Sequence, residues 1–226
     1  MTLPRPFVTL HVAQTLDGRI AAAGARVAIS TREGLEDAHR ARASHDAILV
    51  GGKTVSIDDP LLTVRFFEGP QPLRVVLASS LELPATARLL ERTTTAAGAV
   101  LVIGAEGRAT DGARDRLWAR GAEVCVVPAN GRGWVSLPHA LAVLYARGVR
   151  RLLVEGGARV LTSFLGERLA DYAEIEIAPR IFGDAALAAF GALAGDLPHA
   201  AVAIRRPTVE RLGDNLILRG DVEYPA

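Results

Sequence analysis

One run of residues combines a carboxylate with two glycines: Leu152-Leu153-Val154-Glu155-Gly156-Gly157-Ala158. Its apolar residues predict a buried strand that ends at Glu155 and is followed by a helix. In open α/β sheets, ligands bind beyond the carboxyl ends of strands, and a helix N-terminus attracts pyrophosphate. The run therefore predicts a nucleotide site, in which Glu155 would hold a donor-rich ring. A simple turn is the alternative.

Paired glycines also close a second strand-like segment, Val50-Gly51-Gly52-Lys53-Thr54. Glycines allow a ligand to approach backbone amides closely, so a nucleotide could bind here. A relaxed phosphate-loop pattern runs from Ala47 to Thr54, but Ala47 begins the predicted strand, whereas a phosphate loop starts after one. The spacing therefore argues against a phosphate loop.

Two acidic residues open the next segment, Asp58-Asp59-Pro60-Leu61-Leu62-Thr63-Val64-Arg65. Adjacent carboxylates point in different directions and no histidine lies near them in the sequence, so we predict a turn and no metal site. Arg65, together with Arg42 upstream, could bind a phosphate monoester because guanidinium groups bind phosphate through two hydrogen bonds. Two surface arginines without a ligand are an equally good interpretation.

The segment Thr15-Leu16-Asp17-Gly18-Arg19 follows the first predicted strand. Aspartate can bond the backbone ahead of it and glycine adopts positive φ, so the pattern predicts a tight turn. The sequence contains neither G-x-G-x-x-G nor G-x-S-x-G, and its five histidines lack metal-ligand spacing. Acyl transfer is therefore disfavoured, and any nicotinamide cofactor must be held by a fold other than the standard dinucleotide fold.

The composition is that of an ordinary globular chain of 226 residues, 50% of them hydrophobic. Its formal charge of +1 argues against a nucleic-acid or membrane-surface partner and favours small-molecule chemistry. No apolar window reaches the roughly 18 residues of a membrane span, and no signal peptide is evident. We therefore expect a cytoplasmic protein. The single cysteine, Cys125, lies in an apolar run and is interpreted as a buried structural thiol.

Strand-like and helical segments alternate along the chain, which predicts an α/β fold with a largely parallel sheet. The predicted strands cover residues 7–14, 47–50, 73–77, 99–103, 123–127, 151–154, 172–178 and 216–222. Helices are predicted from Ser30, with Glu33 in capping-box spacing, to Ala43, over 114–120, from Ser136 to Gly148, and after Gly157. No linker or repeat divides the chain, so we expect one domain over residues 1–226.

Taken in order, the motifs resemble the pyrimidine reductase family of riboflavin biosynthesis, the C-terminal reductase domain of a bifunctional deaminase and reductase. The matching residues are Ala13-Gln14-Thr15-Leu16-Asp17-Gly18-Arg19-Ile20-Ala21, His39-Arg40-Ala41-Arg42-Ala43, Asp46-Ala47-Ile48-Leu49-Val50-Gly51-Gly52-Lys53-Thr54-Val55, Asp58-Asp59-Pro60-Leu61-Leu62-Thr63-Val64-Arg65, Arg74-Val75-Val76-Leu77, Leu153-Val154-Glu155-Gly156-Gly157 and Ala178-Pro179-Arg180-Ile181-Phe182-Gly183. The resemblance implies a three-layer α/β/α fold like that of dihydrofolate reductase, with a mixed, mostly parallel central sheet. The H-x-E and C-x-x-C zinc ligands of the deaminase are missing, so we expect no deaminase domain.

The resemblance also implies an activity and a set of contacts. Such reductases use NADPH to reduce the ribosylamino side chain of a pyrimidine 5′-phosphate to a ribitylamino chain, and they are homodimers. The substrate would meet Arg42, Leu62, Arg65 and Glu155, with Glu155 as the candidate catalytic residue. The cofactor would meet Ala13, Thr54, Asp58, Ser79, Gly156, Gly157, Ala158, Arg159, Val160, Leu161, Thr162 and Ser163. No metal is implied.

The chain departs from the family pattern at three places. Many members carry lysine in place of His11 and an aromatic residue in place of Ala28, and an aspartate often follows the strand where Ala78-Ser79-Ser80 stands. Two alternatives therefore stay open: an NADPH-dependent reductase of another heterocycle or imine, such as a pterin, and a nucleotide-binding protein without catalysis. The uracil and the aminated pyrimidinone substrates both fit the pattern, as do NADPH and NADH.

Overall fold

The computed structural model describes residues 3–21, 27–91, 98–193 and 201–225. The chain forms two compact units. The first unit contains Met1–Pro6 and His39–Leu152, and the second contains Phe7–Ala38 and Leu153–Ala226. The division falls inside α1 (Arg32–Ala43) and inside β7 (Arg151–Gly156), so each of these elements contributes residues to both units.

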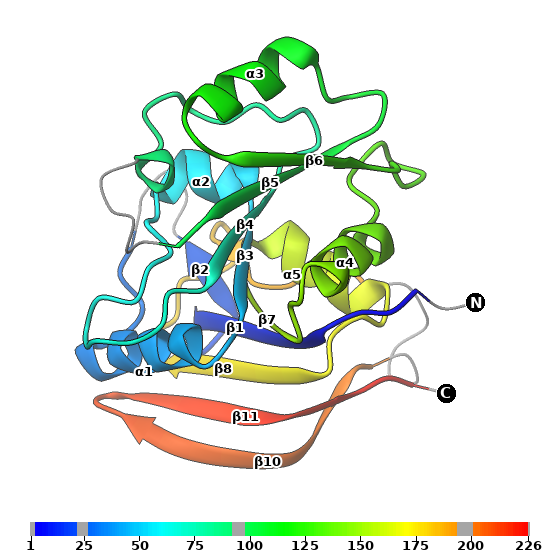
Figure 1. Cartoon of the computed structure of the whole chain (residues 1–226). Coiled ribbons are helices and arrows are strands. Elements are labelled where there is room, and N and C mark those ends of the chain that lie inside the picture. Colours follow the sequence, from blue (N-terminus) through cyan, green and yellow to red (C-terminus); the bar gives the residue numbers. More distant parts are fainter. Residues whose placement is uncertain (1–2, 22–26, 92–97, 194–200, 226) are drawn as a thin grey trace. The chain divides into compact units, whose positions relative to one another are not determined.

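The first unit is built on parallel strands in the order β3 (Ala47–Gly51), β4 (Leu73–Leu77), β5 (Val100–Ala105) and β6 (Glu123–Val127), as Figure 1 shows. The connecting elements are α2 (Gly52–Asp58), the 3-10 turn η1 (Arg88–Leu90), α3 (Asp111–Ala119) and α4 (Leu137–Ala146). Every residue of β3 is buried, as expected for a parallel strand covered on both faces. Ile48, Val76, Val102 and Leu117 belong to one apolar core cluster.

The second unit pairs β1 (Phe7–Thr15) in parallel with β8 (Tyr172–Ala178), followed by β11 (Asn215–Glu223) and β10 (Ala203–Leu212) in antiparallel. A separate two-stranded sheet joins β2 (Arg19–Ala21) to β9 (Leu187–Ala188). Helix α5 (Ala158–Gly166) follows β7 and buries Leu161 and Phe164. Because Thr15 is in register with Ala178, β1 and β8 end together, and the segments after them start at the same edge of the sheet.

The predicted α/β class with mixed, mostly parallel strands is confirmed, and all eight predicted strands lie within two residues of their expected bounds. Strands β2, β9 and β10 and helix α2 were not predicted. β10 is exposed at seven consecutive positions and therefore shows no alternation of apolar and polar residues. Among the described helices, none is both long and apolar enough to cross a membrane.

Three local predictions are wrong in detail. The cap of α1 is Thr31 rather than Ser30: the Gly34 N–H donates to Thr31 Oγ1 at 3.1 Å, whereas the Ser30 hydroxyl donates to the buried carboxylate of Glu176 at 2.6 Å. Helix α3 begins at Asp111, three residues earlier than predicted, because Thr110 caps it. Cys125 is half-buried rather than buried, since β6 lies at the end of the strand order and pairs on one side with β5 alone.

Candidate functional site

Arg42 and Arg65, which the sequence analysis pairs as phosphate ligands, lie close together in the first unit. Arg42, in the last turn of α1, donates from Nη1 to the carbonyl oxygen of Thr63 at 3.2 Å. Arg65 Nη1 lies 3.4 Å from the same oxygen and donates to Thr63 Oγ1 at 2.8 Å. Two guanidinium groups that share one acceptor concentrate positive charge at Thr63, and planar guanidinium groups suit a phosphate. The structure therefore brings the two predicted phosphate ligands together, and their binding of a phosphate stays a prediction.

The loop that carries Arg65 has no regular secondary structure, and side chains hold its backbone in place. The Gln71 carboxamide accepts from the Val64 N–H at 2.8 Å and donates to the Val64 carbonyl at 2.9 Å. His39 Nδ1 accepts from the Arg65 N–H at 2.9 Å. The guanidinium of Arg74 lies 3.4 Å from the Leu61 carbonyl. Together these contacts satisfy backbone groups of Leu61, Val64 and Arg65, which lie outside any helix or sheet.

Leu62 and Asp59 show positive backbone φ in this part of the chain, +58° and +43°. Leu62 is 2% exposed and belongs to the apolar core cluster, so the structure gives this predicted substrate residue a packing role. Asp59 ends α2 in the left-handed conformation, and its carboxylate accepts from the Arg88 N–H at 2.8 Å. The Asp59 carboxylate therefore has a structural role: it holds the backbone at Arg88.

The first unit also contains three of the predicted cofactor residues. Thr54 and Asp58 are half-buried in α2, which begins directly after β3. Residues Ala47 to Gly51 form that strand, so the relaxed phosphate-loop pattern does not form a phosphate loop, in agreement with the spacing argument. Ser79 lies just beyond β4, and its Oγ accepts from the Val135 N–H at 3.2 Å. This contact ties the end of β4 to the segment before α4.

The second unit contains the predicted glycine turn. Glu155 is half-buried near the end of β7, and Gly156 has φ +102°, a conformation that favours glycine. A Cβ atom on Gly156 would lie 3.3 Å from Leu161 Cδ1. The Gly156-Gly157 peptide bond is cis. Helix α5 begins at Ala158, and its N-cap residue, Gly157, has no side chain that could cap the first amides.

The remaining predicted cofactor residues differ in what their side chains contact. Leu161 is fully buried, so it serves the core. Thr162 Oγ1 donates to the Ala158 carbonyl at 2.7 Å and accepts from the Gly191 N–H at 2.8 Å, which ties the segment after β9 to α5. Arg159 is exposed, whereas Val160 and Ser163 on α5 and Ala13 on β1 are half-buried.

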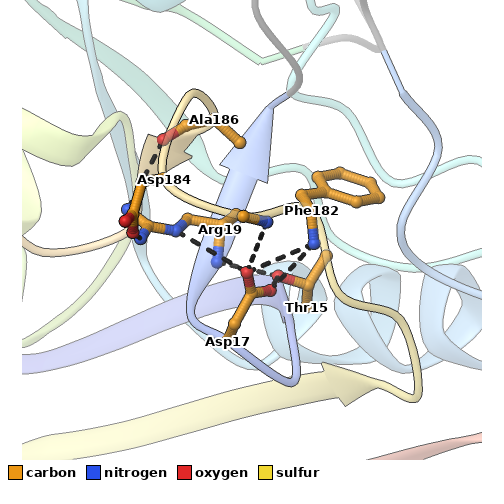
Figure 2. A network of polar contacts seen from close by, with 7 residues as sticks. Thr15, Asp17, Arg19, Phe182, Asp184 and Ala186 are labelled. Atoms are coloured by element: carbon orange, nitrogen blue, oxygen red, sulfur yellow. Dashed lines mark hydrogen bonds and ion pairs between the residues drawn. The ribbon is translucent and has the colours of Figure 1, made fainter.

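The predicted turn at Asp17-Gly18 is confirmed, and Figure 2 shows that its carboxylate is the centre of a network. Asp17 accepts from the Thr15 hydroxyl at 2.5 Å and from the N–H groups of Phe182 and Gly183 at 3.2 and 2.7 Å. The Thr15 hydrogen bond is the main cause that lowers the pKa of Asp17 to about 2. The network fastens the turn after β1 to the segment after β8.

His11, one of the departures from the family pattern, lies in a charged cluster of the second unit. Its ring and the carboxylates of Asp37 and Glu174 offer ligand atoms within 4.8 Å of one another. Arg219 Nη2 lies 2.6 Å from Asp37 Oδ2, and its Nε lies 3.7 Å from Glu174 Oε1. The guanidinium already supplies positive charge to these carboxylates, which disfavours a metal cation at the same place.

The family model described as the RibD C-terminal domain matches residues 6–217. The chain belongs to the RibD C-terminal domain family. It is 35% identical over 224 residues to the riboflavin biosynthesis protein RibD of Aquifex aeolicus, a match that covers 96% of this chain and 58% of that protein. It is 37% identical over 190 residues to the 2,5-diamino-6-ribosylamino-4(3H)-pyrimidinone 5′-phosphate reductase of Archaeoglobus fulgidus, covering 79% of this chain and 83% of that enzyme.

Solved structures agree with the family assignment. RibD of Acinetobacter baumannii superposes with a TM-score of 0.81 at 29% identity, over 97% of this chain and 58% of that one. The chain thus spans a little over half the length of the RibD proteins it matches. The predicted family and fold class are therefore confirmed.

Sequence reasoning missed some side chains that shape the site in this member of the RibD C-terminal domain family. His39 and Arg74 lie within the matched motifs but were given no role, and Gln71 lies outside all of them. Each acts through a hydrogen bond to the backbone of a loop that is between 7 and 26 residues away in the chain. Such contacts follow no periodicity, so the sequence alone carries no signal for them.

Proposed function

We propose that this chain reduces the ribosylamino side chain of a pyrimidine 5′-phosphate to a ribitylamino chain with NADPH, as a step of riboflavin biosynthesis. The observation that carries the proposal is the convergence of Arg42 and Arg65 on Thr63. A phosphate monoester is the ligand that a guanidinium pair suits best, because each planar group can offer two parallel donors. Relatives whose names specify a ribosylamino pyrimidinone 5′-phosphate as substrate support this ligand.

The glycine turn and α5 in the second unit fit the phosphates of a dinucleotide. Gly156, with φ +102°, lets the chain turn directly from β7 into α5, so the positive end of the α5 dipole lies at this turn. Arg159, exposed in the first turn of α5, adds positive charge. Gly156, Gly157, Ala158 and Arg159 would therefore hold the cofactor. When bound, the nicotinamide supplies the hydride.

Glu155 would hold the pyrimidine. A half-buried carboxylate at the end of a strand can accept two hydrogen bonds from the ring N–H or amino groups, which would orient the ring and its sugar side chain. In the ring-opened imine form of the sugar, hydride addition to C1′ and protonation of the attached nitrogen yield the ribitylamino product. The chain then acts mainly by positioning the two reactants.

Neither alternative requires a phosphate site. A pterin carries no phosphate monoester, so in a pterin reductase Arg42 and Arg65 would bind another anion, such as a carboxylate, or no ligand. A nucleotide-binding protein without catalysis would have no need for a substrate phosphate site or for Glu155. The homodimer, the cytoplasmic location and the preference for NADPH over NADH stay predictions from the resemblance.

The deciding experiment supplies the purified protein with NADPH and, in parallel, with the uracil ribosylamino phosphate, its aminated precursor and dihydrofolate. Substrate-dependent oxidation of NADPH at 340 nm, with the ribitylamino product identified by mass spectrometry, is the expected result for one of the pyrimidines. The same assay with NADH measures cofactor preference. Turnover of dihydrofolate alone, or tight NADPH binding without turnover of any substrate, would overturn the proposal.

A further inference from the structure

We infer that Gln71 is a positioning residue for the substrate phosphate, a role that rests on the proposed function. Gln71 lies in the loop between α2 and β4, just before β4. Its side chain reaches back to Val64 in the same loop. Val64 stands between Thr63, on which Arg42 and Arg65 converge, and Arg65 itself. The conformation of Val64 therefore sets the position of one guanidinium relative to the other.

The Gln71 carboxamide binds both polar backbone groups of Val64. Its Oε1 accepts from the Val64 N–H at 2.8 Å, and its Nε2 donates to the Val64 carbonyl at 2.9 Å. A neighbouring strand would satisfy the same two groups in the same way, and Val64 is only 5% exposed, so water is a poor substitute. The Gln71 side chain thus holds the Val64 backbone through the same pair of hydrogen bonds that would fix it in a β-sheet.

The chemistry of this contact requires an amide. Glutamate at position 71 would present two acceptors, and one of them would face the Val64 carbonyl and repel it. Asparagine is one methylene shorter and would not span the same distance. Gln71→Glu therefore removes the clamp while it keeps the volume of the side chain, and Gln71→Ala removes the clamp and the volume together.

Gln71 is also the loop anchor whose replacement leaves the core intact. Arg74 and His39 hold the neighbouring positions Leu61 and Arg65, but both side chains are buried, at 4% and 2% exposure. Their replacement would disturb the core as well as the loop. Gln71 is half-buried. We expect its removal to free Val64 and to let Arg65 move away from Arg42, while α2 and β4 on either side of the loop keep their packing.

The test compares the wild-type protein with Gln71→Ala and Gln71→Glu, using the phosphorylated pyrimidine substrate and the corresponding riboside without phosphate. We expect KM for the phosphorylated substrate to rise about tenfold in both variants, because the phosphate ligands are no longer pre-organised. KM for the riboside and KM for NADPH should stay within about twofold of their wild-type values. Inhibition by inorganic phosphate gives a second measurement, and its inhibition constant should rise in parallel.

The matched control is Asn130→Ala. Asn130 Oδ1 accepts from the Arg132 and Trp134 N–H groups at 3.0 and 3.1 Å, so it is a similar clamp on a loop of the same unit that carries no predicted site residue. This variant should keep the wild-type preference for the phosphorylated substrate. If the Gln71 variants also keep the wild-type preference for the phosphorylated substrate, Gln71 is not a positioning residue. This conclusion holds even if the variants have lower melting temperatures. If the wild-type protein turns over neither compound, the proposed function fails first, and this inference fails with it.

Discussion

Replacement of Arg74 by methionine should destabilise the first unit. Arg74 is 4% exposed and donates to the Leu89 and Gly98 carbonyls at 3.0 and 2.7 Å, with a longer contact to Leu61. Hydrogen bonds from a charged donor contribute about 1.5–3 kcal/mol each, so the two short ones contribute about 3–6 kcal/mol. Methionine of similar length would fill the space and leave the buried Leu89 carbonyl and the partly buried Gly98 carbonyl without this donor.

An opposing effect reduces the expected loss. Arg74 forms no ion pair with any of the described residues, and burial lowers its pKa, so the guanidinium is held at a cost in desolvation. Removal of a buried charge recovers part of that cost, which amounts to several kcal/mol. We therefore expect a net loss of about 2–3 kcal/mol in the free energy of unfolding, or roughly 5–10 °C in Tm for a chain of this size.

Urea and thermal unfolding followed by circular dichroism measure this loss. The control is Arg108→Met: Arg108 is exposed, and its side chain forms no hydrogen bond or ion pair within the described part of the chain. Its replacement should change stability by less than about 0.5 kcal/mol. If Arg74→Met is as stable as the wild-type protein or more stable, the desolvation cost of the guanidinium equals or exceeds what its carbonyl contacts contribute, and the predicted loss is refuted.

Three further predictions concern single residues. Glu155→Gln should lower kcat/KM by about 10- to 100-fold with little change in Tm, since it weakens hydrogen bonds to the pyrimidine; wild-type kinetics would contradict this role. Arg65→Ala should raise KM for the phosphorylated substrate by roughly 10-fold and reduce its salt dependence, and an unchanged KM would remove Arg65 from the phosphate site. Because the pKa of Asp17 is lowered to about 2, its ionised form stabilises the fold above about pH 4, so the Tm deficit of Asp17→Asn should shrink as pH falls from 4 to 2; a constant deficit would contradict the assignment.

Strands β3 and β5 of the first unit could be predicted because burial on both faces makes them continuous apolar runs. β3, with every residue buried, is an example. β10 could not be found in this way, because its exposed residues include Arg205, Arg206 and Glu210 and it is held by pairing with β11. The two-residue connection between these strands, at Gly213 with φ +62°, is the one local signal that a hairpin was present.

Short-range signals also explain why one cap was misplaced. Ser30 and Thr31 are both good capping residues, and the sequence alone cannot tell them apart. The decision comes from Glu176, 146 residues from Ser30, whose buried carboxylate takes the Ser30 hydroxyl and leaves Thr31 to cap α1. A buried carboxylate without a hydrogen-bond donor costs more free energy than a helix N-terminus capped by one residue rather than its neighbour.

The two predicted binding regions were accessible to sequence reasoning to different degrees, and the cause is how each is built. The glycine turn at Gly156 is defined by its own backbone, since φ +102° requires glycine, so its signal lies in adjacent residues. The arginine site is defined by side chains that bind a distant backbone: Gln71 holds Val64, and Arg42 reaches Thr63. Substitution of Gly156 should therefore impair cofactor binding by straining the backbone of the glycine turn itself. Phosphate binding at the arginine site can instead be weakened by substitutions at positions, such as Gln71, that never touch the substrate.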